Sequence, residues 1–87
     1  MTREERRQRA WEQMPAWQRH FAMTLYRLVE EHGGQSKTAI DMAEHGLKVN
    51  QGRLSNYIYG KHVPGLDMVH DMAAFFGVSV LEFIIEG

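Results

Sequence analysis

The chain has 87 residues, which is enough for one small domain. Hydrophobic residues make up 44% of the sequence and charged residues 24%, values typical of a folded globular protein that exclude a disordered chain. There is no cysteine, so disulfides, thiolate metal sites and cysteine nucleophiles are excluded. No stretch reaches the roughly 18 apolar residues of a membrane span. The N-terminal residues also lack the apolar core of a secretory signal, so we expect a cytoplasmic protein.

Charge is distributed unevenly along the chain, although the formal net charge is only -1. One segment, residues 45–66, contains no acidic residue, and its basic residues are Lys48, Arg53 and Lys61. Residues 67–87 contain four acidic residues and no Lys or Arg. The total charge argues against a nucleic-acid-binding protein, but a phosphate backbone responds to the local field of the surface that meets it. The basic segment therefore keeps nucleic-acid binding open, and an ordinary solvated surface is the alternative.

Two helices are predicted before Gly33-Gly34. Thr2 and Glu5 have the spacing of a capping box, which predicts a polar helix over about residues 3–13. After Pro15, a second helix is predicted over about residues 16–32. Its apolar residues recur at helical spacing, so its inward face is expected to hold Trp17, Phe21, Leu25, Leu28 and Val29.

Two shorter helices are predicted on either side of Gly46. Ser36 is expected to cap a helix over about residues 37–45 that directs Ile40 and Ala43 inward. Asn50 is expected to cap a helix that extends to about Tyr59. The inward positions of this helix are Leu54, Tyr57 and Ile58, and its other side carries Gln51, Gly52, Arg53 and Asn56.

The remaining residues predict two more helices. The first spans about residues 66–76, ends at Gly77 and buries Val69, Met72, Ala73 and Phe76. Ser79 and Glu82 have the spacing of a second capping box, at the start of the last helix. No segment alternates as a strand does. The predicted fold is therefore all-α, with five helices around one core in residues 16–87 and a short helical extension in residues 1–15.

A helix, a short turn containing glycine and a second helix form the arrangement that lays the second helix in the major groove of DNA. Here the second helix begins with Asn50-Gln51-Gly52-Arg53. Glutamine can pair with adenine through two hydrogen bonds, and arginine can pair with guanine in the same way. Gly52 would allow the backbone to approach DNA closely. The predicted DNA-facing residues thus lie in residues 45–66, the segment without acidic residues.

Residues 53–64, RLSNYIYGKHVP, resemble the recognition helix and following loop of Cro/cI-type (XRE family) helix-turn-helix regulators. The shared pattern is an aliphatic residue, Ser, a polar residue and an apolar one, then Gly, a basic residue and Pro. Residues 66–84 are similar to the family's last two helices and their Gly-Val-Ser link. The resemblance covers about residues 20–85. The sequence departs from the family at residues 1–15, at Ile58, where many members have Glu, and in a slightly longer connection over residues 43–49.

The resemblance implies a five-helix lambda-repressor-like domain that binds operator DNA as a homodimer and regulates transcription. A repressor is the expected type of regulator, and its expected location is the nucleoid. By position, the expected base-contacting residues are Gln51, Gly52, Arg53 and Asn56. The residues expected at the DNA backbone are Ser36, Lys37, Lys48, Asn50, Ser55, Tyr59, Lys61 and His62.

Both ends of the chain carry candidate contacts of their own. The N-terminal segment contains four basic residues that could form an arm reaching DNA phosphates: Arg3, Arg6, Arg7 and Arg9. Three Glu residues in the same segment offset this charge, so a solvated helix is the alternative. Three roles remain open for Trp11: it covers the domain, forms a dimer contact or belongs to this arm. The apolar residues of the last helix exceed what one face of it can bury, so part of the group Leu81, Phe83, Ile84 and Ile85 is expected to form a symmetric dimer contact.

No residues support an enzyme, a cofactor or a metal site. The five histidines do not have the paired spacing of zinc ligands, and Asp67 and Asp71 lack a partner cluster. Double-stranded DNA is the expected partner. The alternative function is a protein-interaction module of the same fold, such as an antitoxin or adaptor. Its partner would bind the N-terminal extension or the C-terminal helix, and DNA binding would be secondary.

Overall fold

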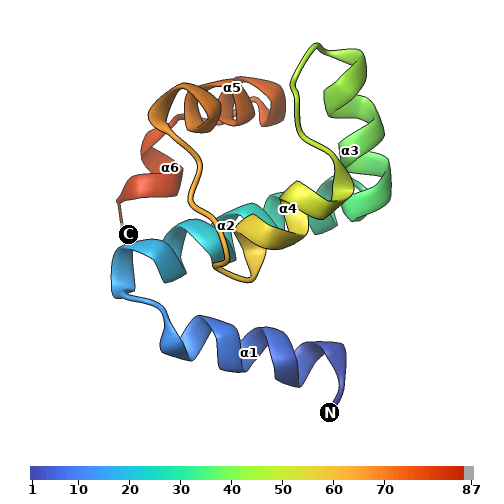
Figure 1. The fold of residues 1–87 in the computed structure, drawn as a ribbon. Helices are drawn as coiled ribbons and strands as arrows, with labels where there is room; N and C mark the ends of the chain where they lie inside the picture. The colour runs from blue at the N-terminus through green and yellow to red at the C-terminus, as the bar shows by residue number, and fades with distance from the viewer. Residues whose placement is uncertain (86–87) are drawn as a thin grey trace.

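The computed structural model describes residues 1–85, and all the regular structure in that range is helical. The six helices (Figure 1) are α1 (Arg3–Gln13), α2 (Ala16–His32), α3 (Gln35–Glu44), α4 (Gln51–Ile58), α5 (Leu66–Phe76) and α6 (Leu81–Ile84). The predicted all-α class is confirmed, and α1, α2 and α5 have the predicted boundaries. These boundaries were predictable because caps and glycines mark them: Thr2 and Glu5 form the expected capping box, and Gly77 ends α5 in the left-handed conformation.

The long helix α2 is the element against which α1, α3, α4 and α6 pack. Its side chains Leu25 and Val29 are fully buried. The core around them also contains Met42, Leu54, Ile58, Met72 and Phe83, which are almost completely removed from solvent. Burying one such side chain is worth about 1.5–3 kcal/mol, so these few contacts account for much of what holds the short helices in place.

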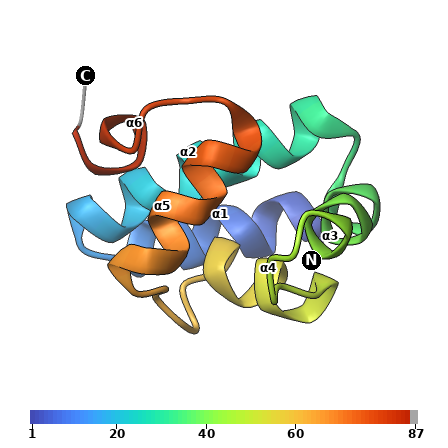
Figure 2. The same ribbon diagram turned by 90° about the horizontal axis from the view of Figure 1, so that it is seen from above.

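Helix α6 lies across the N-terminal half of α2. His20 Nε2 donates to the carbonyl of Glu82 at 2.8 Å, and the rings of Phe21 and Phe83 are 5.4 Å apart. Figures 1 and 2 show α6 and α3 at opposite ends of the molecule. The C-terminal apolar residues and the α3–α4 pair are therefore separate surfaces.

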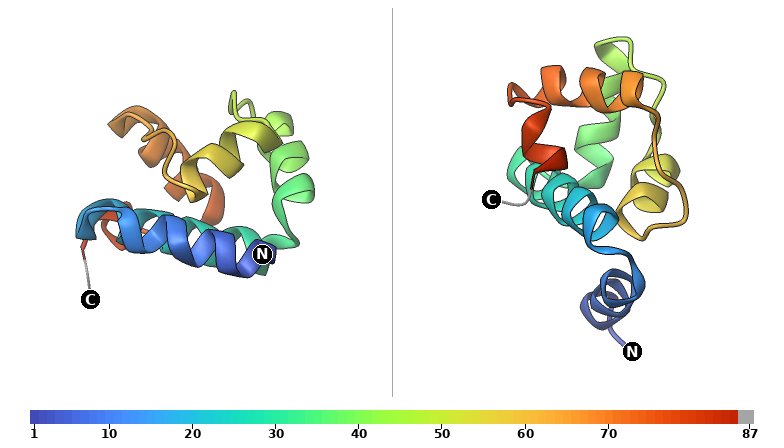
Figure 3. Two further views of the ribbon diagram at one scale, coloured as in Figure 1. Left: turned by 60° about the horizontal axis from the view of Figure 1, so that its bottom comes forward. Right: turned by 90° about the vertical axis from the view of Figure 1, so that its left-hand side faces the viewer.

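Helix α1 runs antiparallel to α2 along its side (Figure 3). The indole Nε1 of Trp11 donates to the carbonyl of Ile58 at 2.9 Å. The guanidinium of Arg7 lies 4.0 Å from the centre of the Tyr26 ring, which is the geometry of a cation–π contact. Arg19 of α2 donates to the carbonyls of Trp11 and Met14 at 2.8 and 3.0 Å. These contacts join α1 to both α2 and α4.

Gly60 has a backbone conformation that favours glycine. Its φ is +77°, and a Cβ there would collide with the side chain of Met14, which follows α1. The end of α4 and the end of α1 approach each other closely because this glycine has no side chain.

The prediction of an inward side chain is wrong at three positions. Trp17 is 58% exposed, because it lies in the first turn of α2, before the residues that α6 contacts. Ile40 is also 58% exposed and Ala43 is exposed, because α3 turns a different face inward. The buried residues of α3 are Thr38, Ala39 and Met42.

Two predicted caps also differ from the structure. The N-cap of α3 is Gly34, and Ser36 lies inside the first turn. The helix begins early because Gly34, with φ +100°, makes a turn that other residues rarely adopt. Ser79 Oγ accepts from the amide of Leu81 at 3.2 Å, but the N-cap residue of α6 is Val80. Instead of closing a capping box, the Glu82 carboxylate lies 3.6 Å from Arg27 Nη2.

The two tryptophans provide a matched test of how α1 is attached. We expect Trp11→Phe to lower the free energy of unfolding by about 1–3 kcal/mol, because it removes a buried hydrogen bond and leaves the Ile58 carbonyl without its donor. Trp17→Phe, at an exposed position, should change it by no more than about 0.5 kcal/mol. Denaturant unfolding followed by circular dichroism measures both. Equal losses for the two variants would contradict this role of Trp11.

Candidate nucleic-acid interface

The rotation of α4 about its axis is fixed by its buried side. Leu54, Tyr57 and Ile58 are buried, as predicted, and α4 packs on both α2 and α3 through this side. Val49, in the connection from α3, is buried next to them in the core. The first turn of the helix, before these buried residues, is exposed and carries Gln51 and Arg53.

The first turn of α4 is capped as predicted. Asn50 Oδ1 accepts from the amide of Arg53 at 2.8 Å, and this bond satisfies one of the free donors at the helix start. Gln51, Gly52 and Arg53 follow directly, and all three are exposed. Asn56, one turn later, is half-buried. Of the four predicted base-contacting residues, three therefore lie together at the solvent-facing start of the helix.

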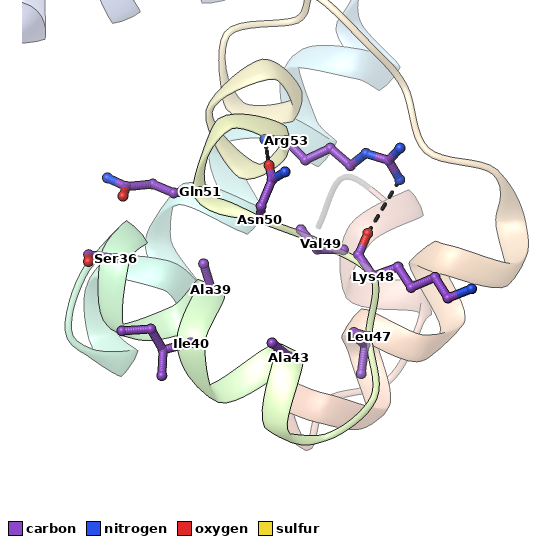
Figure 4. A pocket seen from close by; sticks show the side chains of 10 residues that line it. All are labelled: Ser36, Ala39, Ile40, Ala43, Leu47, Lys48, Val49, Asn50, Gln51 and Arg53. Carbon is purple, nitrogen blue, oxygen red and sulfur yellow. Dashed lines mark hydrogen bonds between the residues drawn. The ribbon is translucent and has the colours of Figure 1, made fainter.

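A hollow of about 680 Å³ lies between α3, the connection and the start of α4 (Figure 4). Its walls are mainly apolar and include Ile40, Ala43 and Val49, so the two residues of α3 wrongly predicted to be in the core line this surface instead. Gln51 and Arg53 point away from α4 in different directions (Figure 4). Arg53 Nη1 donates to the carbonyl of Lys48 at 3.3 Å on the exposed surface.

Lys37, expected at the DNA backbone, is held by a neighbouring carboxylate. Its Nζ lies 2.8 Å from Asp41 Oδ2, and His32 Nε2 contacts the same oxygen at 2.7 Å. Hydrogen bonds from Lys37 and His32 lower the pKa of Asp41 below its ordinary value of 3.8. Asp41 thus offsets much of the local field of Lys37. The sequence signal for this pair was the i, i+4 spacing, which places the two side chains on one helix face.

The other predicted backbone-contacting residues divide between two surfaces. Lys48 and Asn50 line the hollow of Figure 4. Ser55, Tyr59 and Lys61 line a second hollow, on the side of α4 that faces α1. Ser36 borders both hollows, and His62 is exposed in the loop after α4.

Of the four arginines of the predicted arm, Arg7 is not available to a partner, because its side chain is only 14% exposed and lies against Tyr26. Arg3, Arg6 and Arg9 are exposed. Trp11, left open from the sequence, is buried and attaches α1 to α4. The sequence carried no signal for that bond, because its two residues are 47 positions apart.

The predicted C-terminal dimer contact is wrong for Phe83. This side chain is only 1% exposed and packs on Phe21, because α6 turns it towards α2. Leu81, Ile84 and Ile85 are each more than half exposed. The exposed apolar side chains at this end are thus the three of α6 and the residue that follows it.

Within the part of the chain that the structure describes, no three His, Asp or Glu side chains gather as a group able to hold a metal ion. No helix among residues 1–85 has both the length and the apolar character required to cross a membrane. Comparisons of the chain with protein-family models, with curated proteins and with solved structures found no match.

Proposed function

We propose that this protein is a sequence-specific DNA-binding transcriptional regulator whose α3 and α4 form a helix-turn-helix unit with α4 as the recognition helix. The observation that carries the proposal is the exposed first turn of α4, in which Gln51, Gly52 and Arg53 face solvent on a helix fixed by its buried side. Side chains at the N-terminal end of a recognition helix are the ones that contact base edges in the major groove.

The chemistry of this turn suits base recognition. The Gln51 amide can donate to and accept from adenine, and the Arg53 guanidinium can donate twice to guanine. The hollow beside them offers Ile40 and Ala43 for apolar contact with a thymine methyl group. Lys48 precedes this turn, Lys61 follows the end of α4, and both are exposed and can contact phosphates.

Gly52 supports the proposal because the protein's own fold does not require a glycine there. Its φ is not in the left-handed region, and a Cβ would meet only Asn50 Oδ1, at an ordinary contact distance of 3.4 Å. Glycine is unfavourable within a helix, so its presence at this position calls for another explanation. Close approach of the backbone to DNA is such an explanation.

We further propose that the protein binds a near-palindromic site as a homodimer through Leu81, Ile84 and Ile85. Three exposed apolar residues at one end of a small domain are typical of an interface.

The same apolar surface favours the second candidate function, a module that binds another protein and contacts DNA only secondarily. Selection from a pool of random duplexes separates the two functions. A regulator should enrich a motif with two-fold symmetry. The absence of any enriched motif at low salt would overturn the DNA-binding proposal and favour the protein-binding module.

We expect Arg53→Ala to weaken binding to the selected site by about 1–3 kcal/mol and to relax specificity at one base pair, because it removes a base contact. Lys61→Ala should instead weaken binding to selected and random duplexes alike and reduce the salt dependence of both. Fluorescence anisotropy with the two duplexes measures these effects, with Arg9→Ala as the control. Equal losses of Arg53→Ala on both duplexes would exclude a base-contacting role for Arg53.

We expect Gly52→Ala to separate folding from binding. The free energy of unfolding should stay the same or rise by up to about 1 kcal/mol, because alanine favours the helix and meets no obstacle. Binding to the selected duplex should weaken at least tenfold, or about 1.4 kcal/mol, because the added methyl group holds the backbone away from DNA. Thermal unfolding and anisotropy of the same sample provide the comparison. Undiminished affinity would show that DNA does not approach α4 at this residue.

We expect Ile84→Glu to convert the homodimer into a monomer, because it places a charge in the apolar contact. Leu66→Glu is the matched control, since Leu66 is an exposed apolar residue of α5. Sedimentation at micromolar concentration measures both variants. A wild-type chain that is monomeric under these conditions would contradict the proposed interface.

A further inference from the structure

A second hollow, of about 970 Å³, separates α1 from α4. One wall carries Arg3 and Arg6 of α1, and the other carries Ser55 and Tyr59 of α4 with Lys61 just beyond it. Its floor is the junction of α2 and α3, at Gly33-Gly34 and the first residues of α3. We refer to this hollow as the α1–α4 groove.

We infer that the α1–α4 groove binds the sugar–phosphate backbone of one DNA strand, next to the bases that α4 contacts. This inference rests on the proposed DNA-binding function and extends it to α1, which lies outside the helix-turn-helix unit. The groove combines cationic side chains on both walls with the hydroxyl groups of Ser55 and Tyr59, and these are the groups that proteins use to hold phosphates.

The cations of the groove are not neutralised by nearby acids. Arg3, Arg6 and Lys61 form no ion pair with any residue from 1 to 85. Of the nearby acids of α1, Glu5 closes the capping box with Thr2, and Glu4 lies 4.0 Å from Arg7. Glu30 is the one acidic residue among those lining the described groove. The residues that line the groove thus carry three cations against one carboxylate.

The start of α3 adds donors to the floor of the groove. No side chain caps this ten-residue helix, so the first backbone N–H groups, at Gln35 and Ser36, keep their donors free for a partner. A helix N-terminus also favours negative charge through its dipole. Both residues line the groove together with Arg3 and Arg6, so phosphate-binding groups of two kinds meet there.

Helix α1 is held in place before DNA arrives. Trp11 bonds to the end of α4, Arg7 packs on Tyr26, and Arg19 holds the two carbonyls at the end of α1. Arg3 and Arg6 thus sit on a fixed helix rather than on a mobile arm. A preorganised contact loses less entropy on binding than a flexible arm does.

The test measures how DNA binding by the full chain depends on salt. Arg3→Gln/Arg6→Gln is compared with Arg9→Gln, which removes an exposed arginine of the same helix that does not line the groove. Affinity is measured by fluorescence anisotropy at salt concentrations from about 50 to about 200 mM, a range over which the loss of affinity through counterion release is measurable. The selected duplex and a random duplex are both used. Circular dichroism of each variant verifies that it is folded.

If the groove holds two phosphates, the double variant should reduce the slope of log K against log salt by about 1.8, because each lost contact removes about 0.9. Arg9→Gln should leave the slope unchanged, and Arg3→Lys/Arg6→Lys should largely restore it. If the double variant has the same slope of log K against log salt as Arg9→Gln, the groove does not bind phosphates and the inference is overturned. If the wild-type chain shows no sequence preference, the proposed function is overturned instead. The salt dependence of binding to the random duplex then still tests whether the groove binds phosphates.

Discussion

The contact of Leu54, Tyr57 and Ile58 with the core is the constraint on which the candidate site depends. These three residues occupy one side of a helix of only eight residues, too short to be stable alone, so tertiary burial supplies its stability. The same burial sets which residues face outward. Gln51 and Arg53 are exposed because they lie in the first turn, before Leu54, the first buried residue of the helix, and the Asn50 cap fixes where this turn begins.

A second consequence of this constraint is that α1 depends on α4. The Trp11 indole bonds to the carbonyl of Ile58, at the end of the helix whose start carries the candidate base contacts. Gly60, directly beyond it, leaves room for Met14. Any change in the angle of α4 therefore moves both the candidate base-contacting turn and the carbonyl to which α1 is bonded. The segment outside the sequence resemblance is thus structurally joined to the unit at its centre.

The sequence predicted helix boundaries well and orientations less well, for a physical reason. A boundary depends on neighbouring residues, such as Thr2 with Glu5 or Gly77 in the left-handed conformation, and those are visible in the sequence. Whether an apolar side chain is buried depends on what packs against it. Trp17 continues the stripe of Phe21 and Leu25, yet its side chain stays exposed, and Phe83 is buried because it meets Phe21. The exposed turn of α4 was predictable because both its cap and its buried side lie within ten residues.

The distribution of charge explains how a chain with a net charge of -1 can have a surface suited to DNA. The cations near α4 and the groove lie on exposed positions, whereas the acids of α5, Asp67 and Asp71, are on another helix. Because the two sets nearly cancel overall, long-range attraction to arbitrary DNA is weak, and the short-range contacts must determine affinity. Under the proposed function, a low overall charge favours selectivity, because the affinity for arbitrary DNA is then limited to the phosphate contacts near α4 and in the groove.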